Sequence, residues 1–135
     1  MFVFPWLEKY SIGVEAFDEQ HKKLVELLNQ LASAMAEGKG KTVLEPVLNN
    51  LIKYTVFHFN EEEKYFDRFD YSGAEVHRVE HLKLIEEVKQ FKTDYDAGKI
   101  GITVELMRFL KGWLINHIAD TDKEFGKLLN NKNIN

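Results

Sequence analysis

Apolar residues recur along most of this chain at alternating steps of three and four positions, the spacing of an α-helix with one buried face. Four such stripes can be traced, over residues 14–35, 44–69, 74–95 and 106–117. Segments that contain glycine separate them, and only two prolines interrupt the 135 residues. The pattern predicts an all-α fold, an antiparallel up-down-up-down four-helix bundle.

A chain of this length is too short for two ordinary domains. We therefore expect one domain over residues 1–135, with residues 1–11 as an N-terminal arm across the bundle and residues 12–130 as the bundle. Pro46 is expected in the first turn of the second helix, where its missing N–H matters little. Asp18 is expected to cap the first helix or occupy its first turn, and Glu61 and Glu63 to be solvated.

The four expected inward faces carry polar residues where apolar ones would normally lie. All five histidines of the chain fall on them, together with one glutamate: His21, His58, Glu62, His77, His81 and His117. Residues four apart share a helix face, so Glu62 reaches back over His58, and His77 lies beside His81. Burying so many imidazoles without a cation would be unfavourable, so the pattern predicts a metal site.

The ligand chemistry indicates which metal. Imidazole and carboxylate donors without any cysteine suit iron or manganese better than a structural zinc site, which usually uses thiolates. We predict a pair of non-haem irons.

The fourth helix offers two candidate carboxylates after His117. Asp120 fits an undisturbed helix, whereas Asp122 would point away by more than a quarter turn. One extra residue in the turn, as in a π-helix, would instead bring Asp122, Phe125 and Leu129 inward and make the better core. We prefer Asp122 for this reason, and Asp120 remains the alternative from straight-helix geometry.

Two octahedral ions that share Glu62, Asp122 and one solvent-derived bridge would leave a single coordination position open. That position would belong to the ion held by His21 and His58. Five apolar residues are placed to wall it: Leu24, Phe59, Trp113, Leu114 and Ile118. At helical spacing these residues could equally be core filler.

The segment Asp18-Glu19-Gln20-His21, the His58/Glu62 and His77/His81 pairs, and His117 with Asp122 together resemble the hemerythrins. All seven ligand positions occur in the order and spacing of that family, and a single domain without partner or output domains is similar to its bacterial members. The resemblance implies two non-haem irons with an oxo or hydroxo bridge, and reversible O2 binding at the diferrous site. It also implies that Asp122 is the bridging residue and that Trp113, Leu114 and Ile118 lie near the gas.

The expected function is O2 carriage, storage or delivery without turnover, so we do not expect an enzyme. The alternatives are a di-iron O2 or redox sensor and an oxidoreductase that consumes peroxide or nitric oxide. Bundles that activate oxygen typically use more carboxylates and paired Glu-x-x-His motifs, none of which occurs here.

The composition of the chain argues against some classes of binding partner. A net charge of -4 and a pI near 5.7, without a basic stripe, argue against nucleic acid. No uninterrupted apolar run is long enough for a bilayer, and the apolar opening lacks the features of a signal peptide. The absence of cysteine fits a reducing cytoplasm, where we expect a monomer that binds O2.

Overall fold

The structure is a computed structural model that describes residues 5–37, 41–98 and 104–135. The side chains of residues 41–44 and 104–106 lie outside that description, so the expected inward positions Leu44 and Leu106 are not placed, nor is the break at residues 38–40. The described helices are η1 (Glu8–Tyr10), α1 (Glu15–Ala36), α2 (Lys41–Arg68), α3 (Ala74–Asp96), α4 (Val104–Asn116), η2 (His117–Asp122) and α5 (Lys123–Asn131). No β-strand occurs in these ranges.

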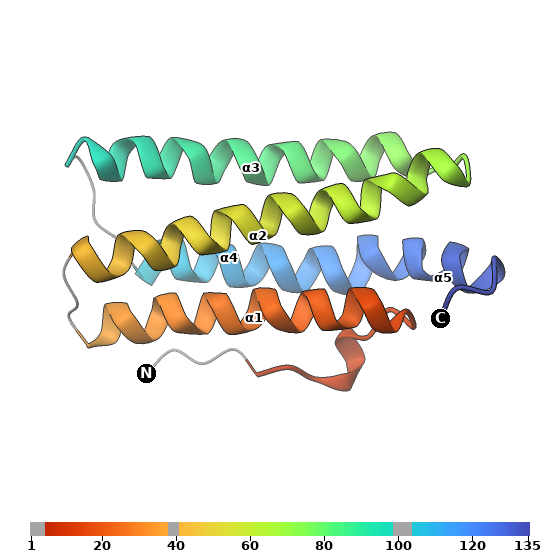
Figure 1. Ribbon diagram of the computed structural model, residues 1–135, viewed down its shortest axis with the longest axis horizontal. Coiled ribbons are helices and arrows are strands. Elements are labelled where there is room, and N and C mark those ends of the chain that lie inside the picture. Colours follow the sequence, from red (N-terminus) through yellow and green to blue (C-terminus); the bar gives the residue numbers. More distant parts are fainter. Residues whose placement is uncertain (1–4, 38–40, 99–103) are drawn as a thin grey trace.

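Helices α1, α2 and α3 alternate in direction, and α4, η2 and α5 form one continuous fourth rod (Figure 1). The described part of the N-terminal arm, residues 5–11 with η1, runs beside α1 in the same view. This arrangement confirms the predicted antiparallel four-helix bundle with its arm. Among the described helices, none combines the length and the apolar character that a membrane span requires.

Helix α1 begins without the expected cap. Its N-cap residue, Val14, offers no side-chain hydrogen bond. The carboxylate of Asp18 instead accepts hydrogen bonds from the backbone N–H of Ile12, at 2.9 Å, and from the hydroxyl of Ser11. Of the two expected positions for Asp18, the structure bears out the first turn of α1 and not the cap, because the preceding segment folds back and takes up that carboxylate.

The turn between α2 and α3 lies in the glycine-containing segment between the second and third predicted helices. Asp70 adopts a left-handed conformation with φ of 49°, and the N–H of Tyr71 donates to the carbonyl of Phe66 at 3.0 Å, which closes the end of α2. At the other end, α2 begins at Lys41, so Pro46 lies in its second turn rather than its first and removes one intrahelical hydrogen bond.

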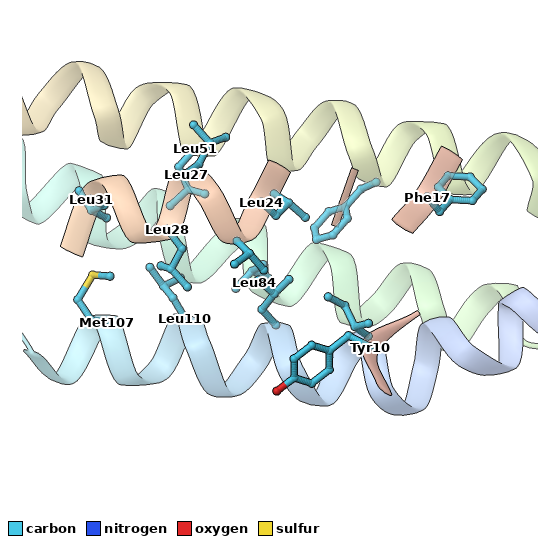
Figure 2. Packing of buried hydrophobic residues seen from close by; sticks show 14 of the residues in the cluster. Tyr10, Phe17, Leu24, Leu27, Leu28, Leu31, Leu51, Leu84, Met107 and Leu110 are labelled. Atoms are coloured by element: carbon cyan, nitrogen blue, oxygen red, sulfur yellow. The ribbon is translucent and has the colours of Figure 1, made fainter. Parts of the chain in front are cut away.

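The core is apolar along most of the bundle, from Leu31 and Met107 at one end toward Phe17 near the other (Figure 2). Phe125 and Leu129 of α5 are fully buried, as predicted for a widened turn after His117. A polar cluster interrupts this core between an aromatic layer of Phe17, Phe66 and Phe125 and the aliphatic stretch that begins at Leu24.

Candidate metal centre

The structure brings together all seven residues that the sequence singled out. They come from α1, α2, α3 and η2, and each is at most 2% exposed: His21, His58, Glu62, His77, His81, His117 and Asp122. Their donor atoms form two groups in which all atoms lie within 4.8 Å of one another, one with three histidines and one with two. Glu62 and Asp122 belong to both groups.

The three-histidine group, made by His77, His81 and His117, is compact. The Nε2 atom of His117 lies 3.2 Å from Nε2 of His77 and 3.1 Å from Nε2 of His81. Oδ1 of Asp122 lies 2.8 Å from Nε2 of His77, and Oε1 of Glu62 lies 3.2 Å from Nε2 of His81. Three imidazole nitrogens and two carboxylate oxygens thus converge on one small volume.

The two-histidine group, made by His21 and His58, lies on the other side of the carboxylates. Oδ2 of Asp122 is 3.0 Å from Nε2 of His21, and Oε1 of Glu62 is 3.4 Å from Nε2 of His58. The two oxygens of Asp122 therefore face different groups, whereas Glu62 contacts His58, His77 and His81 through Oε1. Asp122 already has the orientation of a bridging carboxylate.

The position of Asp122 depends on η2, which is a π-helix over His117–Asp122. A π-helix carries one residue more per turn than the α-helix around it, so the residue five after His117 returns to the same face. Asp122 is fully buried, whereas Asp120 is exposed. The predicted widened turn is confirmed, and the straight-helix alternative at Asp120 does not reach the cluster.

The chemistry of these atoms fits a cation. Inward atoms of His21, His58, Glu62 and Asp122 are buried and have no hydrogen-bond partner among the described residues. Unsatisfied buried polar groups are rare in proteins because each one loses its hydration without replacement. Metal coordination would satisfy all of them at once.

Three outer hydrogen bonds hold histidine rings from behind. Nδ1 of His81 lies 3.0 Å from Oε2 of Glu63, Nδ1 of His117 lies 3.3 Å from Oε1 of Glu80, and Nδ1 of His58 lies 2.6 Å from Oε1 of Gln20. An ionised carboxylate only accepts hydrogen bonds, so Nδ1 carries the proton and Nε2 presents a lone pair inward. The outer partners therefore select the tautomer that a metal requires.

Sequence reasoning did not find these outer partners. Glu63 was expected to be solvated, and it is instead half-buried against His81. Gln20 and Glu80 stand one position from His21 and His81, and that adjacency was the available signal. It could not identify the partners, because Gln20 and Glu80 contact His58 and His117 on other helices.

Electrostatics within the cluster favour positive charge at its centre. Burial lowers the pKa of His117, but Asp122 and Glu80 outweigh that effect and raise it to about 9. Burial, together with His117 and His77, lowers the pKa of His81 to about 2. Burial and the neighbouring Asp122 raise the pKa of Glu62 well above its ordinary value. In the metal-free protein near neutral pH, His117 therefore carries a positive charge while His81 stays neutral.

An apolar cavity of about 50 Å³ lies along the bundle next to the cluster, and Phe59, which stacks on His81 at 3.8 Å between centroids, forms part of its wall. Four of the five predicted pocket residues line it, namely Leu24, Phe59, Trp113 and Leu114, and it continues to Leu48 and Phe91. Ile118 is buried but does not line this cavity. Trp113 stacks on the His117 ring at 4.4 Å between centroids.

Comparisons with known proteins agree with this geometry. The family model described as the hemerythrin HHE cation binding domain matches residues 12–129. A bacteriohemerythrin of Methylococcus capsulatus is 31% identical over 121 residues, which are 90% of this chain and 92% of that protein. A bacteriohemerythrin of Pseudomonas aeruginosa is 32% identical over 117 residues, 87% of this chain and 75% of that protein. The crystal structure of a wild-type hemerythrin matches with a TM-score of 0.87 at 29% identity, covering 93% of this chain and 97% of that one.

Proposed function

The chain belongs to the hemerythrin family, and from this premise we propose that it binds two non-haem irons and, at that centre, O2 reversibly. The binding would serve carriage, storage or delivery of the gas without turnover. The observation that carries the proposal is the convergence of seven buried donor residues whose inward atoms have no other partner.

In this proposal the two groups hold one ion each. His77, His81 and His117 would bind one iron, and His21 and His58 the other. Glu62 and Asp122 would contribute to both ions, and the opposed oxygens of Asp122 support that role. When bound, such an iron pair supplies an open coordination position for O2 and the electrons that the gas takes up.

The chain's own residues supply the surroundings that reversible binding needs. Leu24, Phe59 and Leu114 line the cavity beside the cluster and offer no hydrogen bonds to water. Exclusion of water slows proton delivery and the escape of reduced oxygen species, and so favours release of intact O2 over oxidation of the centre. The donor set supports the same role, since it is rich in histidine rather than carboxylate.

The test starts with iron analysis of protein reconstituted under argon, which should give two irons per chain. Exposure to air should produce a new visible absorption band, and evacuation should remove it over repeated cycles. His77→Ala should reduce the iron content, whereas Lys64→Ala, on the exposed surface of α2, should not. Steady consumption of O2 in the presence of a reductant, instead of a reversible spectral change, would favour the oxidoreductase alternative.

A further inference from the structure

The two groups of the metal centre differ in the hydrogen bonds that hold their histidines from outside. In the three-histidine group, two rings are backed by carboxylates, His81 by Glu63 and His117 by Glu80. In the two-histidine group, His58 is backed by the neutral amide oxygen of Gln20. One ring in each group, His21 and His77, has a buried Nδ1 without a partner among the described residues. The outer negative charge therefore lies beside the three-histidine group and not beside the two-histidine group.

Each of the two outer carboxylates is fixed by a further contact. The hydroxyl of Thr121 lies 2.9 Å and 3.0 Å from the two oxygens of Glu80, and Thr121 belongs to the π-helical turn η2. Arg78 holds Glu63 from α3, with 3.6 Å between Nε and Oε1, and also pairs with Asp67 at 2.6 Å. These anchors keep both carboxylates against their histidines.

The consequence for a bound metal follows from imidazole chemistry. A carboxylate that accepts the Nδ1 proton makes Nε2 more basic and a stronger donor, and loss of such a partner typically weakens metal binding about 10–100-fold. A neutral amide oxygen orients the ring but adds no negative charge. The three-histidine group gains this effect from Glu63 and Glu80, and the two-histidine group does not.

We propose that Glu63 and Glu80 are positioning residues that make the three-histidine group the tighter of the two metal subsites, so that it loads first. The two-histidine subsite, oriented by Gln20, is the weaker and fills second. This inference rests on the proposed function only for the existence of two metal subsites, and O2 chemistry does not enter it.

Titration of the metal-free protein with Co²⁺ tests the order of loading without any redox reaction. Absorption in the visible range should show two binding steps for the unaltered protein. His21→Ala should remove the weaker step and keep the tighter one. Glu63→Gln and Glu80→Gln should each weaken the tighter step about 10–100-fold while changing the weaker step much less.

Two further variants separate this role from general electrostatics. Gln20→Glu places a carboxylate behind His58 and should tighten the second step, which narrows the gap between the two. Glu61→Gln is the matched control, because it removes the same charge two residues from Glu63 on a side chain of similar exposure, 28% against 30%. Glu61 pairs with Lys64 at 3.0 Å rather than with a histidine, so both steps should stay unchanged.

The outcomes distinguish the two proposals. Equal affinities in the two steps, or a first step that Glu63→Gln and Glu80→Gln leave intact, would overturn the inference even if the iron protein binds O2 reversibly. Two unequal, glutamate-dependent steps in a protein that does not bind O2 reversibly would support the inference and refute the proposed function. Absence of any Co²⁺ binding would refute both.

Discussion

His21 of α1 and Asp122 of η2 meet inside the bundle, with 3.0 Å between Nε2 of the histidine and Oδ2 of the aspartate, and neither side chain is exposed. The contact exists because η2 is a π-helical turn that rotates Asp122 inward. Oδ1 of the same carboxylate lies 2.8 Å from His77. One extra residue in a turn thus places a single carboxylate between two groups of histidines.

The first prediction compares the two aspartates of this turn. Asp122→Ala should abolish binding of at least one iron and with it the oxygenated spectrum, because both groups lose a ligand oxygen. Asp120→Ala changes an exposed position and should alter stability by no more than about 0.5 kcal/mol. Iron analysis and visible absorption of both variants check this. Loss of iron from the Asp120 variant alone would reverse the assignment.

The second prediction concerns the cavity wall beside the cluster. Leu114→Ala should enlarge the cavity next to His117, admit water and speed autoxidation, while both irons and the helical content are retained. The rate is measured as the decay of the oxygenated band in air.

Leu48→Ala is the matched control for Leu114. It enlarges the same cavity, but at a position about 15 Å along α2 from His58, estimated from the helical rise. Both variants should lose about 2–5 kcal/mol of unfolding free energy, and the Leu114 variant should show the larger increase in autoxidation. Equal increases would remove the special role of Leu114.

The third prediction uses two glycines in helices. A Cβ atom on Gly126 of α5 would lie 2.1 Å from the carbonyl oxygen of Ile12, so Gly126→Ala must displace the segment that crosses α5. Overpacking of this kind should cost about 1–3 kcal/mol of unfolding free energy. A Cβ atom on Gly112 of α4 would meet no other described part of the chain within 4 Å, apart from the backbone of its own helix, so Gly112→Ala should stabilise the protein by about 0.5–1 kcal/mol. Urea unfolding of both variants measures whether the free energy of unfolding falls for Gly126→Ala and rises for Gly112→Ala.

The fourth prediction is the pH dependence of the metal-free protein, whose stability should be greatest near pH 6.5. Below that pH the unfolded chain takes up protons on His58 and His81, whose pKa values are lowered in the folded protein, to about 2 for His81. Glu62 acts in the opposite direction, because its raised pKa keeps one proton on the folded protein that the unfolded chain has released. The net excess of protons on the unfolded chain makes stability fall with acidification by about 1.4 kcal/mol per pH unit.

Above pH 6.5 the sign reverses. The folded protein retains protons on His117, whose pKa is about 9, and on Glu62, while the unfolded chain has released them. Stability should therefore fall as pH rises toward 9. Urea unfolding of the metal-free protein at pH 5, 6.5 and 8.5, values chosen to bracket the shifts, measures both limbs. A flat profile, or a maximum at the alkaline end, would contradict the assignment of charges.

The amino-acid sequence by itself determined the helices, the turn at Asp70 and the inward faces, because these depend on neighbours within a few residues. The pairs His58/Glu62 and His77/His81 are local in the same sense, since residues four apart share a helix face. Even the widened turn after His117 was readable, because only that phase slip buries both Phe125 and Leu129.

Only the tertiary structure decided which side chains meet across helices. Gln20 contacts His58, and Glu80 contacts His117. Asp18 accepts a hydrogen bond from the N–H of Ile12 rather than capping α1. The rotation and separation of packed helices result from the sum of many side-chain contacts. The position of a residue along its own helix therefore does not determine which residue of another helix it contacts. The sequence therefore identified the inward residues of the candidate centre, whereas helix packing decided which charges hold them from outside.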